Sequence, residues 1–278
     1  MTDASPPLAG VVGWPIGHSR SPALHGHWLS RYGIDGHYVP LGIAPANFET
    51  AIRALPKLGF RGVNITTPYK QTVMSLADQI SDRAALIGAA NTLSFREGGG
   101  IYADNTDGHG FIENLRQNAP GWSARSGPCL VIGAGGAARA VICALMNAGA
   151  PEIRIANRTR QRADGLKDQY GARVTVVDWN RASDAMAGAM TIVNTTSLGM
   201  TGQPPLNLSF TAAHGDAVVT DIVYSPLITP FLAEAAANNL RTVDGLGMLL
   251  HQAAPGFRQW FGRDPEVDAE LRRAVQAA

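Results

Sequence analysis

Cysteine is almost absent from this chain of 278 residues, which contains only Cys129 and Cys143. Two cysteines, one in an expected strand and one in the helix after it, indicate reduced core thiols and not a disulfide scaffold. We also expect no metal site. No apolar run approaches the length of a membrane-spanning helix, and residues 1–10 lack the basic start and apolar stretch of a signal peptide. We therefore expect a cytoplasmic protein that makes no membrane contact.

Excess charge of either sign is also absent. The chain has 23 lysine and arginine residues against 22 aspartate and glutamate residues, a formal net charge of +1. This balance gives no reason to expect nucleic acid as a partner. Lysine itself is scarce, because nearly all of the basic residues are arginine and only Lys57, Lys70 and Lys167 are lysine. Each lysine is therefore a candidate for a specific role.

The first part of the chain alternates short strands with helices. This alternation predicts an α/β fold with a mostly parallel sheet. Ser21 is expected to cap the first helix, with Pro22 in its first turn. The expected strands are 11–13, 38–41, 61–65, 92–95 and 101–103, and the expected helices are 22–32, 45–58, 71–76, 81–87 and 107–118.

After residue 128 the alternation starts again and predicts a second, doubly wound sheet of five strands. Residues 245–278 contain only helical patterns, so we expect them to pack back on the first sheet. The first domain is then discontinuous, residues 1–106 and 245–278, and a Rossmann-type domain, residues 107–244, is inserted in it. The expected strands of the inserted domain are 129–132, 152–156, 174–177, 191–194 and 217–221, and its later helices are 136–147, 159–170 and 230–239.

The turn after the first strand of the inserted domain has the spacing Gly133-x-Gly135-x-x-Ala138. Gly133 permits a tight turn, Gly135 lets the backbone approach a phosphate, and Ala138 keeps strand and helix close. The N–H groups of the helix that starts at Gly136 and Ala137, together with its dipole, attract an anion. The order strand, turn, helix predicts a dinucleotide site. The alternative is an ordinary turn between a strand and a helix.

The end of the next strand indicates which dinucleotide binds. An NAD site usually has an acidic residue there, which accepts hydrogen bonds from the ribose. This chain has Asn157-Arg158-Thr159 instead, with Arg162 close behind, and guanidinium groups bind a 2′-phosphate well. The alternative is a solvated helix start, but cations in a first turn oppose the helix dipole. We therefore expect NADP as the cofactor.

Three segments of the first domain carry groups suited to binding a small polar molecule. Ser19 and Ser21 precede a helix and could bind a carboxylate, although spacing alone favours a simple capping role for Ser21. Lys70 follows a proline-containing turn at the end of a strand, where ligands collect in open α/β sheets, although most lysines are solvated surface cations. Asn91 and Asp107, the latter where a loop meets the expected helix 107–118, add amide and carboxylate groups, although Asn and Asp residues in loops more often make local turns.

Together these segments resemble the shikimate dehydrogenase family over nearly the whole chain, from Gly13 to Pro265. One departure is visible, because family members often carry Asn after the His of the first motif and this chain has Gly26 after His25. The matching motifs are Ser19-x-Ser21-Pro22, Asn64-Ile65-Thr66-x-Pro68-x-Lys70, Gly88-Ala89-x-Asn91-Thr92, Asn105-Thr106-Asp107-Gly108, the glycine turn, Asn157-Arg158-Thr159, Asn194-Thr195-Thr196-Ser197-x-Gly199-Met200, Asp221-Ile222-Val223-Tyr224-x-Pro226 and Gly245-x-Gly247-Met248-Leu249-x-x-Gln252-Ala253.

The resemblance implies a substrate domain interrupted by an NADP domain. It implies reversible reduction of 3-dehydroshikimate to shikimate with NADPH, a step in the biosynthesis of chorismate and the aromatic amino acids. Lys70 and Asp107 would form the catalytic pair, and the sequence leaves open which of them moves the proton. The implied substrate-binding residues are Ser19 and Ser21 for the carboxylate, Asn64, Thr66, Asn91 and Gln252 for the ring hydroxyls, and Tyr224. The implied cofactor-binding residues are Gly133, Gly135, Gly136, Ala137, Asn157, Arg158, Thr159, Arg162, Thr195, Ser197, Met200, Ile222, Gly245 and Met248.

The main alternative is a quinate/shikimate dehydrogenase with broader substrate and cofactor use. Such enzymes tend to have an acidic residue at the position of Asn157 and often alter one of the serines, so this sequence argues against it. A second alternative is a catalytically silent sensor on the same fold, which would be expected to lose Lys70 and Asp107. We expect a small-molecule substrate, no nucleic-acid partner, and a monomer or homodimer.

Overall fold

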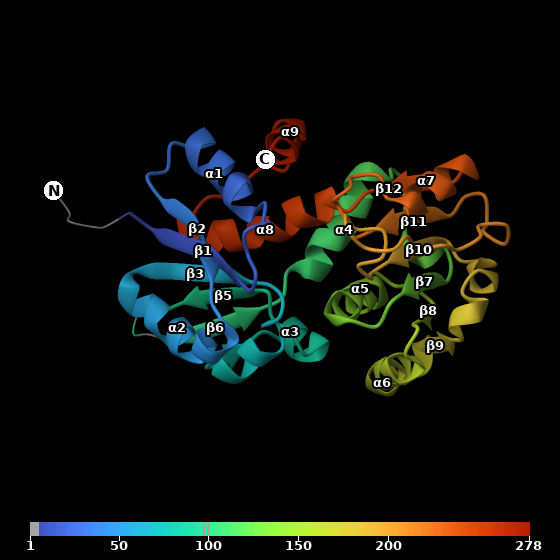
Figure 1. Ribbon diagram of the computed structural model, residues 1–278, viewed down its shortest axis with the longest axis horizontal. Helices are drawn as coiled ribbons and strands as arrows, with labels where there is room; N and C mark the ends of the chain where they lie inside the picture. The colour runs from blue at the N-terminus through green and yellow to red at the C-terminus, as the bar shows by residue number, and fades with distance from the viewer. Residues whose placement is uncertain (1–5, 97, 99) are drawn as a thin grey trace. The chain divides into compact units, whose positions relative to one another are not determined.

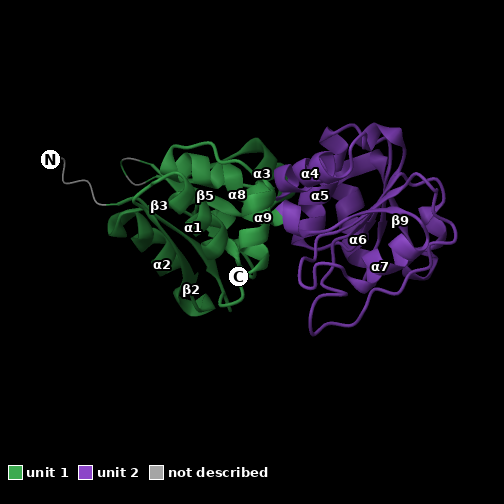
Figure 2. Ribbon diagram, turned by 90° about the horizontal axis from the view of Figure 1, so that it is seen from above, with its two compact units in different colours: residues 1–106, 249–278 green, residues 107–248 purple. Residues whose placement is uncertain are grey.

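The computed structural model describes residues 6–96, 98 and 100–278. The chain separates into two compact units, Met1–Thr106 with Leu249–Ala278 and Asp107–Met248, which Figure 2 colours green and purple. Each unit has its own six-stranded sheet, and Figure 1 labels most of their helices and strands. The predicted α/β class with mostly parallel sheets is therefore confirmed.

The first sheet is mixed. Its strands are β1 (Leu8–Gly13), β2 (His37–Gly42), β3 (Phe60–Ile65), β4 (Gln79–Ile80), β5 (Thr92–Phe95) and β6 (Ile101–Asp104). They are arranged in the order β2-β1-β3-β5-β6-β4. The pairs β1–β2, β1–β3 and β4–β6 are parallel, whereas β3–β5 and β5–β6 are antiparallel. The helices around this sheet are α1 (Ser21–Arg31), α2 (Phe48–Ala54), α3 (Asp82–Ile87), α8 (Leu246–Phe261) and α9 (Ala269–Gln276).

Alternate residues of the central strands face opposite sides of the first sheet, as the period of a strand requires. Val63 and Ile65 of β3 pack against buried side chains of α2 and of the 3-10 helices that follow it. Gly62 faces α8, because a Cβ atom at this position would overlap the indole nitrogen of Trp260. Figure 1 shows α1 and α2 on opposite sides of this sheet. Both faces of the sheet are therefore covered by helices.

The two C-terminal helices complete the first unit. The indole of Trp28 in α1 donates a hydrogen bond of 2.9 Å to the carbonyl oxygen of Glu266. Arg31 forms ion pairs with Glu266 and Asp268, at 3.1 and 2.6 Å. Asp268 also caps α9, since its Oδ1 accepts from the N–H of Leu271 at 2.9 Å. Polar contacts as well as apolar packing thus hold the C-terminal segment against α1.

The second sheet is parallel throughout. Its strands are β7 (Cys129–Ile132), β8 (Ile153–Ala156), β9 (Val174–Val177), β10 (Thr191–Asn194), β11 (Val218–Asp221) and β12 (Arg241–Val243). Its helices are α4 (Asp107–Asn118), α5 (Gly136–Asn147), α6 (Arg160–Tyr170) and α7 (Pro230–Ala237). The strand order is β12-β11-β10-β7-β8-β9. Read from β9, this is the dinucleotide-binding order, with its reversal between β7 and β10.

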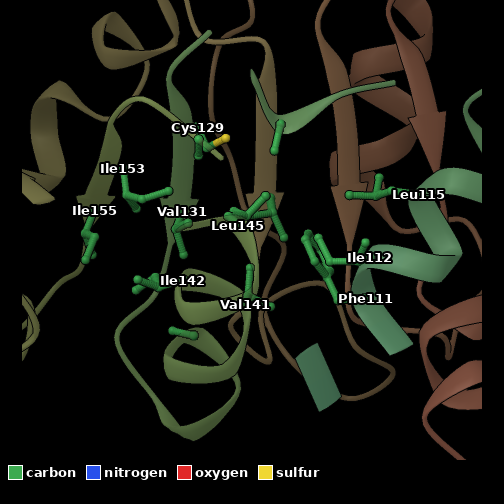
Figure 3. Close-up of a cluster of buried hydrophobic side chains, with 14 of the residues drawn as sticks. Phe111, Ile112, Leu115, Cys129, Val131, Val141, Ile142, Leu145, Ile153 and Ile155 are labelled. Atoms are coloured by element: carbon green, nitrogen blue, oxygen red, sulfur yellow. The ribbon is translucent and has the colours of Figure 1, made fainter. Parts of the chain in front are cut away.

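The alternation of side chains in β7 supplies two cores, one on each face of the second sheet. Cys129 and Val131 pack with apolar side chains of α4, α5 and α6, in the cluster drawn in Figure 3. Leu130 and Ile132 pack on the other face, with α7 and the segments before it. Burial on both faces explains why β7 is apolar without interruption. Each such aliphatic side chain contributes roughly 1.5–3 kcal/mol when fully buried.

Four details of the predicted secondary structure were wrong. The strands β4 and β12 were not predicted, so each sheet has six strands where five were expected. Residues Thr72–Leu76 form a 3-10 helix and not an α-helix. Ser21 does not cap α1, because α1 already starts at Ser21 and the cap position is Arg20, without a side-chain capping bond. Instead, the hydroxyl of Ser19 accepts from the N–H of Ser21 at 3.3 Å.

The close approach of α8 to β3 makes a prediction about stability. Gly62→Ala should lower the free energy of unfolding by about 3 kcal/mol, because the added methyl group would overlap Trp260 and the carbonyl oxygen of Leu93. Gly26→Ala is the matched control. A Cβ atom there meets nothing within 4 Å, and replacing glycine inside α1 should stabilise by about 0.5–1 kcal/mol. Urea unfolding of both variants checks this, and a Gly62→Ala variant as stable as the wild type would contradict the packing described.

Candidate functional site

The strand directions of the first unit bring polar groups to one edge of its sheet. β1 and β3 are parallel and end at the same edge, β5 starts there, and β6 ends there. Residues at or just beyond these strand ends are therefore neighbours although they are distant in the sequence. They are Ser19 and Ser21 after β1, Asn64, Thr66 and Lys70 at the end of β3, Asn91 before β5, and Asp104, Asn105 and Thr106 at the end of β6.

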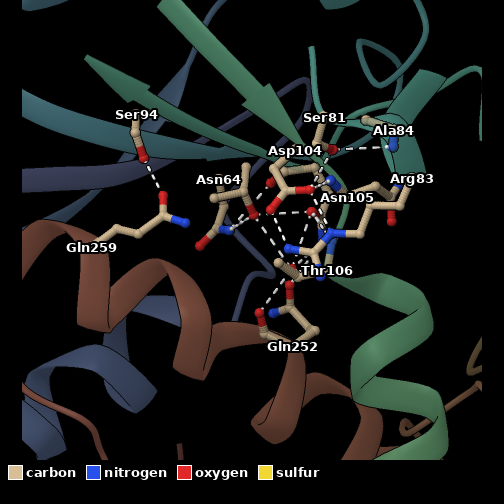
Figure 4. A network of polar contacts seen from close by, with 12 residues as sticks. Asn64, Ser81, Arg83, Ala84, Ser94, Asp104, Asn105, Thr106, Gln252 and Gln259 are labelled. Carbon is tan, nitrogen blue, oxygen red and sulfur yellow. Dashed lines mark hydrogen bonds and ion pairs between the residues drawn. The ribbon is translucent and has the colours of Figure 1, made fainter. Parts of the chain in front are cut away.

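A buried hydrogen-bond network is centred on the carboxamide of Asn91, which is 2% exposed. Its Oδ1 accepts from the backbone N–H of Thr106 at 2.8 Å. Its Nδ2 donates to the hydroxyl of Thr106 at 3.0 Å and to Oε1 of Gln252 at 3.1 Å. The hydroxyl of Thr106 lies 2.8 Å from the carbonyl oxygen of Gln252, to which it donates. Figure 4 shows Thr106 and Gln252 within this network, which joins α8 to the edge of the sheet.

Asn64 extends the network along the same edge. Its Nδ2 donates to the carbonyl oxygen of Asn91 at 3.1 Å and to the hydroxyl of Thr92 at 3.3 Å. Its Oδ1 accepts from the phenol of Tyr38 at 2.7 Å. The structure thus brings together three of the predicted substrate-binding amides, those of Asn64, Asn91 and Gln252. Amide and hydroxyl groups of this kind are suited to binding a polyhydroxylated ligand.

A buried carboxylate, that of Asp104, anchors the segment that follows β6. Arg83 forms a bidentate ion pair with it, and Ser81 donates to it at 2.6 Å, as Figure 4 shows. Its Oδ1 also accepts from the N–H of Asn105 at 2.7 Å. Burial alone would raise the pKa of Asp104, but the hydrogen bonds from Arg83 and Ser81 and the charge of Arg83 outweigh burial and lower it. The loop that leads to Asp107 is therefore held by a charged anchor.

The remaining predicted residues of this edge differ in how deeply they are buried. Ser21 is 6% exposed, whereas Ser19, Thr66 and Lys70 are half-buried. The backbone of Lys70 is fixed, because its carbonyl oxygen accepts from the N–H of Ala90 at 2.8 Å. Asp107 is 5% exposed; it directly follows Thr106 and is the first residue of α4. The backbone positions of both predicted catalytic residues are thus set by hydrogen-bonded neighbours.

The glycine turn of the second unit has the geometry of an anion-binding loop. Gly133 has a φ of +112°, and a Cβ atom there would lie 2.6 Å from Oγ1 of Thr195. By contrast, Cβ atoms at Gly135 and Gly136 would meet nothing within 4 Å, so this side of the turn is open. α5 starts at Gly136, and the first N–H groups of a helix, here including that of Ala137, have no partner within the helix. The residues present therefore fit a dinucleotide pyrophosphate.

Two arginines beyond β8 are available for a further anion. Arg158 and Arg162 are exposed, and neither forms an ion pair within residues 6–96, 98 and 100–278. Arg160 differs, because Asp178 and Asp164 both pair with it. The side chain of Asn157 is used locally, since its Nδ2 donates to the carbonyl oxygen of Thr159 at 2.8 Å. The exposed guanidinium groups fit a 2′-phosphate.

The loop after β10 packs directly against the glycine turn. Thr195 donates its hydroxyl to the carbonyl oxygen of Ile132 at 2.7 Å, which makes its side chain a support for the turn. Ser197 and Met200 lie further along this loop and are exposed, Met200 to 40%. This is the point at which the strand order reverses, where ligands bind in open α/β sheets.

A second buried carboxylate, that of Asp221, joins the loops after β10 and β11. Its Oδ1 accepts from Nδ2 of Asn194 at 3.0 Å and from the N–H of Val223 at 2.9 Å, and its Oδ2 accepts from Thr229 at 2.8 Å. Burial raises the pKa of Asp221 to about 6, although these hydrogen bonds oppose the shift. Asp221 therefore holds in place the loops that carry Met200 and Tyr224.

The other predicted cofactor residues of the second unit surround a tight backbone contact. A Cβ atom at Gly245 would lie 2.5 Å from the carbonyl oxygens of Ile222 and Val223, so only glycine fits. Ile222 and Met248 are partly buried and pack against the same apolar cluster. Tyr224 is half-buried. These residues therefore lie where β11 and β12 end.

Three residues with clear roles here were not predicted from the sequence. Tyr38, Arg83 and Asp104 each act through a partner on another element, namely Asn64 for Tyr38 and one another for Arg83 and Asp104. The one available signal was Asp104 itself, an acidic residue directly before the motif Asn105-Thr106-Asp107-Gly108. Nothing in the sequence pairs it with Arg83.

Family models match three successive parts of the chain. The shikimate dehydrogenase substrate binding domain matches residues 11–93, the shikimate/quinate 5-dehydrogenase model matches residues 116–247, and the shikimate 5′-dehydrogenase C-terminal domain matches residues 245–273. A curated relative from Paracoccus denitrificans, named shikimate dehydrogenase (NADP(+)), is 61% identical over 271 residues, which cover 98% of this chain and 96% of the relative. The chain belongs to the shikimate dehydrogenase family.

Solved structures of this family have the same fold. The shikimate 5-dehydrogenase of Thermus thermophilus, in complex with NADP(H) and shikimate, is 36% identical with a TM-score of 0.87, over 97% of this chain and 98% of that chain. The quinate dehydrogenase of Corynebacterium glutamicum, in complex with NAD, is 32% identical with a TM-score of 0.90, over 98% and 99%. Proteins named for different substrates and cofactors thus share this architecture, and the fold alone does not separate them.

Two classes of feature are not found in the part of the chain that the structure describes. None of its helices is both long enough and apolar enough to cross a membrane. No group of three or more histidine, cysteine, aspartate or glutamate side chains is arranged to hold a metal ion among the same residues.

The ion pair between Arg83 and the buried carboxylate of Asp104 predicts how stability depends on pH. Asp104→Asn should lower the free energy of unfolding by about 2 kcal/mol near neutral pH, because charge-assisted hydrogen bonds are lost. Since the pKa of Asp104 is lowered by folding, the stabilisation is complete above the unfolded value of about 3.9 and is lost as the pH falls through the folded value. The difference in the free energy of unfolding between wild type and variant should therefore become smaller below about pH 4.

Denaturant midpoints measured over this pH range check the prediction. Asp35→Asn, which changes an exposed carboxylate of the same unit, is the control and should show no such narrowing. A difference that stays constant down to about pH 3 would contradict the role of the pair.

Proposed function

We propose that this protein is an NADP-dependent shikimate dehydrogenase, which interconverts 3-dehydroshikimate and shikimate. The observation that carries the proposal is the buried set of amides and hydroxyls around Asn91. This set lies beside the end of β3, the strand that precedes Lys70. The relatives named shikimate dehydrogenase (NADP(+)), one of them 60% identical over the whole chain, support it.

We assign the predicted binding roles to the residues as follows. We assign substrate binding to residues 1–106 and 245–278 and NADP binding to residues 107–244. Ser19 and Ser21 would bind the carboxylate, and Asn64, Thr66, Asn91 and Gln252 the ring hydroxyls, with Tyr224 as a further substrate contact. The glycine turn would hold the pyrophosphate and Arg158 with Arg162 the 2′-phosphate. Thr195, Ser197, Met200, Ile222, Gly245 and Met248 would complete the cofactor site.

Lys70 and Asp107 are the groups we assign to the reacting hydroxyl. Bound NADP supplies the hydride chemistry, and the substrate oxygen must exchange a proton in the same reaction. The Lys70 ammonium stabilises negative charge that develops on this oxygen and has a proton to donate in the direction of reduction. The Asp107 carboxylate accepts a hydrogen bond from the same hydroxyl and so helps to orient it. Asp107 owes its position to Thr106, which Asn91 holds.

The first test is a comparison of lysines. Lys70→Ala should lower kcat for shikimate oxidation at least about 100-fold, with little change in KM, because a general acid–base group is removed. Lys57→Ala is the matched control, since Lys57 is an exposed lysine of the same unit. The rate of NADPH formation, followed by absorbance, gives both values. A Lys70→Ala variant with wild-type turnover would contradict the assignment.

The same assay separates the proposal from the alternatives. No turnover of shikimate with NADP+ would remove the proposed function. A preference for NAD+, or equal rates with quinate and shikimate, would favour a quinate/shikimate dehydrogenase. A protein that binds shikimate without turnover would favour a silent sensor.

Cofactor choice gives a second test. Arg158→Ala should raise the KM for NADP+ about tenfold or more, since a charge-assisted hydrogen bond to the 2′-phosphate contributes about 1.5–3 kcal/mol. The rate with NAD+, which lacks this phosphate, should stay the same. Arg160→Ala should have a smaller effect on the KM for NADP+, because Asp178 and Asp164 already engage that arginine. Equal effects of the two substitutions would contradict the assignment of Arg158.

A further inference from the structure

Tyr38 in β2 reaches across β1, the neighbouring strand of the first sheet, to the predicted substrate site. In the strand register Tyr38 lies beside Ala9, and Asn64 of β3 lies beside Val11. Both pairs lie on one face of β1, because residues two apart share a face. The small side chain of Ala9, which is 0% exposed, leaves room for the phenol ring. The hydroxyl of Tyr38 thereby comes to 2.7 Å from Oδ1 of Asn64.

The direction of each hydrogen bond defines what Asn64 can offer a ligand. The phenol has a single hydrogen, and it is donated to Oδ1 of Asn64. Nδ2 of Asn64 donates to the carbonyl oxygen of Asn91 and to the hydroxyl of Thr92. Both hydrogens of the amide are therefore used, and the capacity that remains is the second lone pair of Oδ1. In this arrangement Asn64 accepts a hydrogen bond from a ligand hydroxyl.

The phenol also lies near the predicted carboxylate site. Burial raises the pKa of Tyr38 well above its usual value, and the nearby side chain of Ser21 opposes this shift. Tyr38 thus lies between Ser21 and Asn64, the residues assigned to the two ends of the substrate.

The ring of Tyr38 is held by a neutral aromatic neighbour. His25 stacks on it with ring centres 3.8 Å apart and planes inclined by 4°. His25 is completely buried, and within the described residues neither of its ring nitrogens has a hydrogen-bond partner. Burial lowers the pKa of His25 to about 3, with a small opposing effect of Asn64. The histidine is therefore an uncharged platform that restricts the phenol to one orientation.

We propose that Tyr38 is a positioning residue for the substrate, which acts through Asn64. Its hydroxyl keeps the carboxamide of Asn64 turned so that Oδ1 accepts from one ring hydroxyl. The inference rests on the proposed function, because it takes shikimate as the ligand of this edge. It adds a determinant of which polyol binds.

Tyr38→Phe tests this role, since it removes one oxygen and keeps the ring that stacks on His25. The KM for shikimate should rise about tenfold, while kcat falls less than about threefold and the KM for NADP+ is unchanged. Discrimination between shikimate and its analogues should weaken as well. The comparison uses kcat/KM for shikimate and for analogues that each lack one ring hydroxyl. For one of these analogues, the loss of kcat/KM relative to shikimate should be smaller in the variant than in the wild type. A merely structural role for Tyr38 would not change this ratio.

A double substitution tests the route through Asn64. If Tyr38 acts through Asn64, adding Tyr38→Phe to an Asn64→Ala variant should change the KM for shikimate less than twofold. Tyr32→Phe is the control, because Tyr32 is a tyrosine of the same unit whose hydroxyl accepts from the N–H of Glu266 and has no contact with Asn64. It should keep the wild-type KM.

The outcomes separate the two proposals. If the wild type oxidises shikimate but Tyr38→Phe keeps the wild-type KM and discrimination, the inference about Tyr38 is overturned and the proposed function stands. Additive effects of Tyr38→Phe and Asn64→Ala would also overturn it. If the wild type does not oxidise shikimate with NADP+, both proposals fail.

Discussion

The hydrogen bonds of Asn91 are the interactions on which the first unit depends. The side-chain amide of Asn91 binds Thr106 at the end of β6 and Gln252 in α8. The backbone carbonyl of Asn91 accepts from Asn64 at the end of β3. One buried amide thus connects the sheet edge with a helix from the far end of the sequence. Because a buried polar group without a partner destabilises the folded state by about 1–3 kcal/mol, these partners are interdependent.

Both units place their reactive groups according to the same rule of topology. In parallel sheets the carboxyl ends of neighbouring strands meet at one edge, and loops there can carry polar side chains without disturbing the core. In the first unit this edge holds amides, hydroxyls and Lys70. In the second unit it holds a glycine turn between β7 and α5, supported by Thr195 from β10. A buried carboxylate steadies the loops in each case, Asp104 in the first unit and Asp221 in the second.

The sequence predicted those parts of the structure that depend on local patterns. The bounds of β7, β9, β10 and α4 agree with the prediction because apolar runs and turn residues mark them. β12 was missed because three residues, Arg241–Val243, carry too short a pattern. The capping role of Ser21 was wrong because the helix starts one residue earlier than expected. The contacts of Tyr38 and Arg83 could not be predicted, since each joins elements that only the tertiary fold brings together.

The most direct test of the account is the affinity for shikimate after removal of the central amide. For Asn91→Ala we expect the KM for shikimate to rise at least about 100-fold, because two or more buried hydrogen bonds that organise the site are lost. The KM for NADP+ should stay within about twofold of the wild type, since the glycine turn and the arginines belong to the other unit. A variant that binds shikimate as tightly as the wild type would show that the network around Asn91 does not form the substrate site.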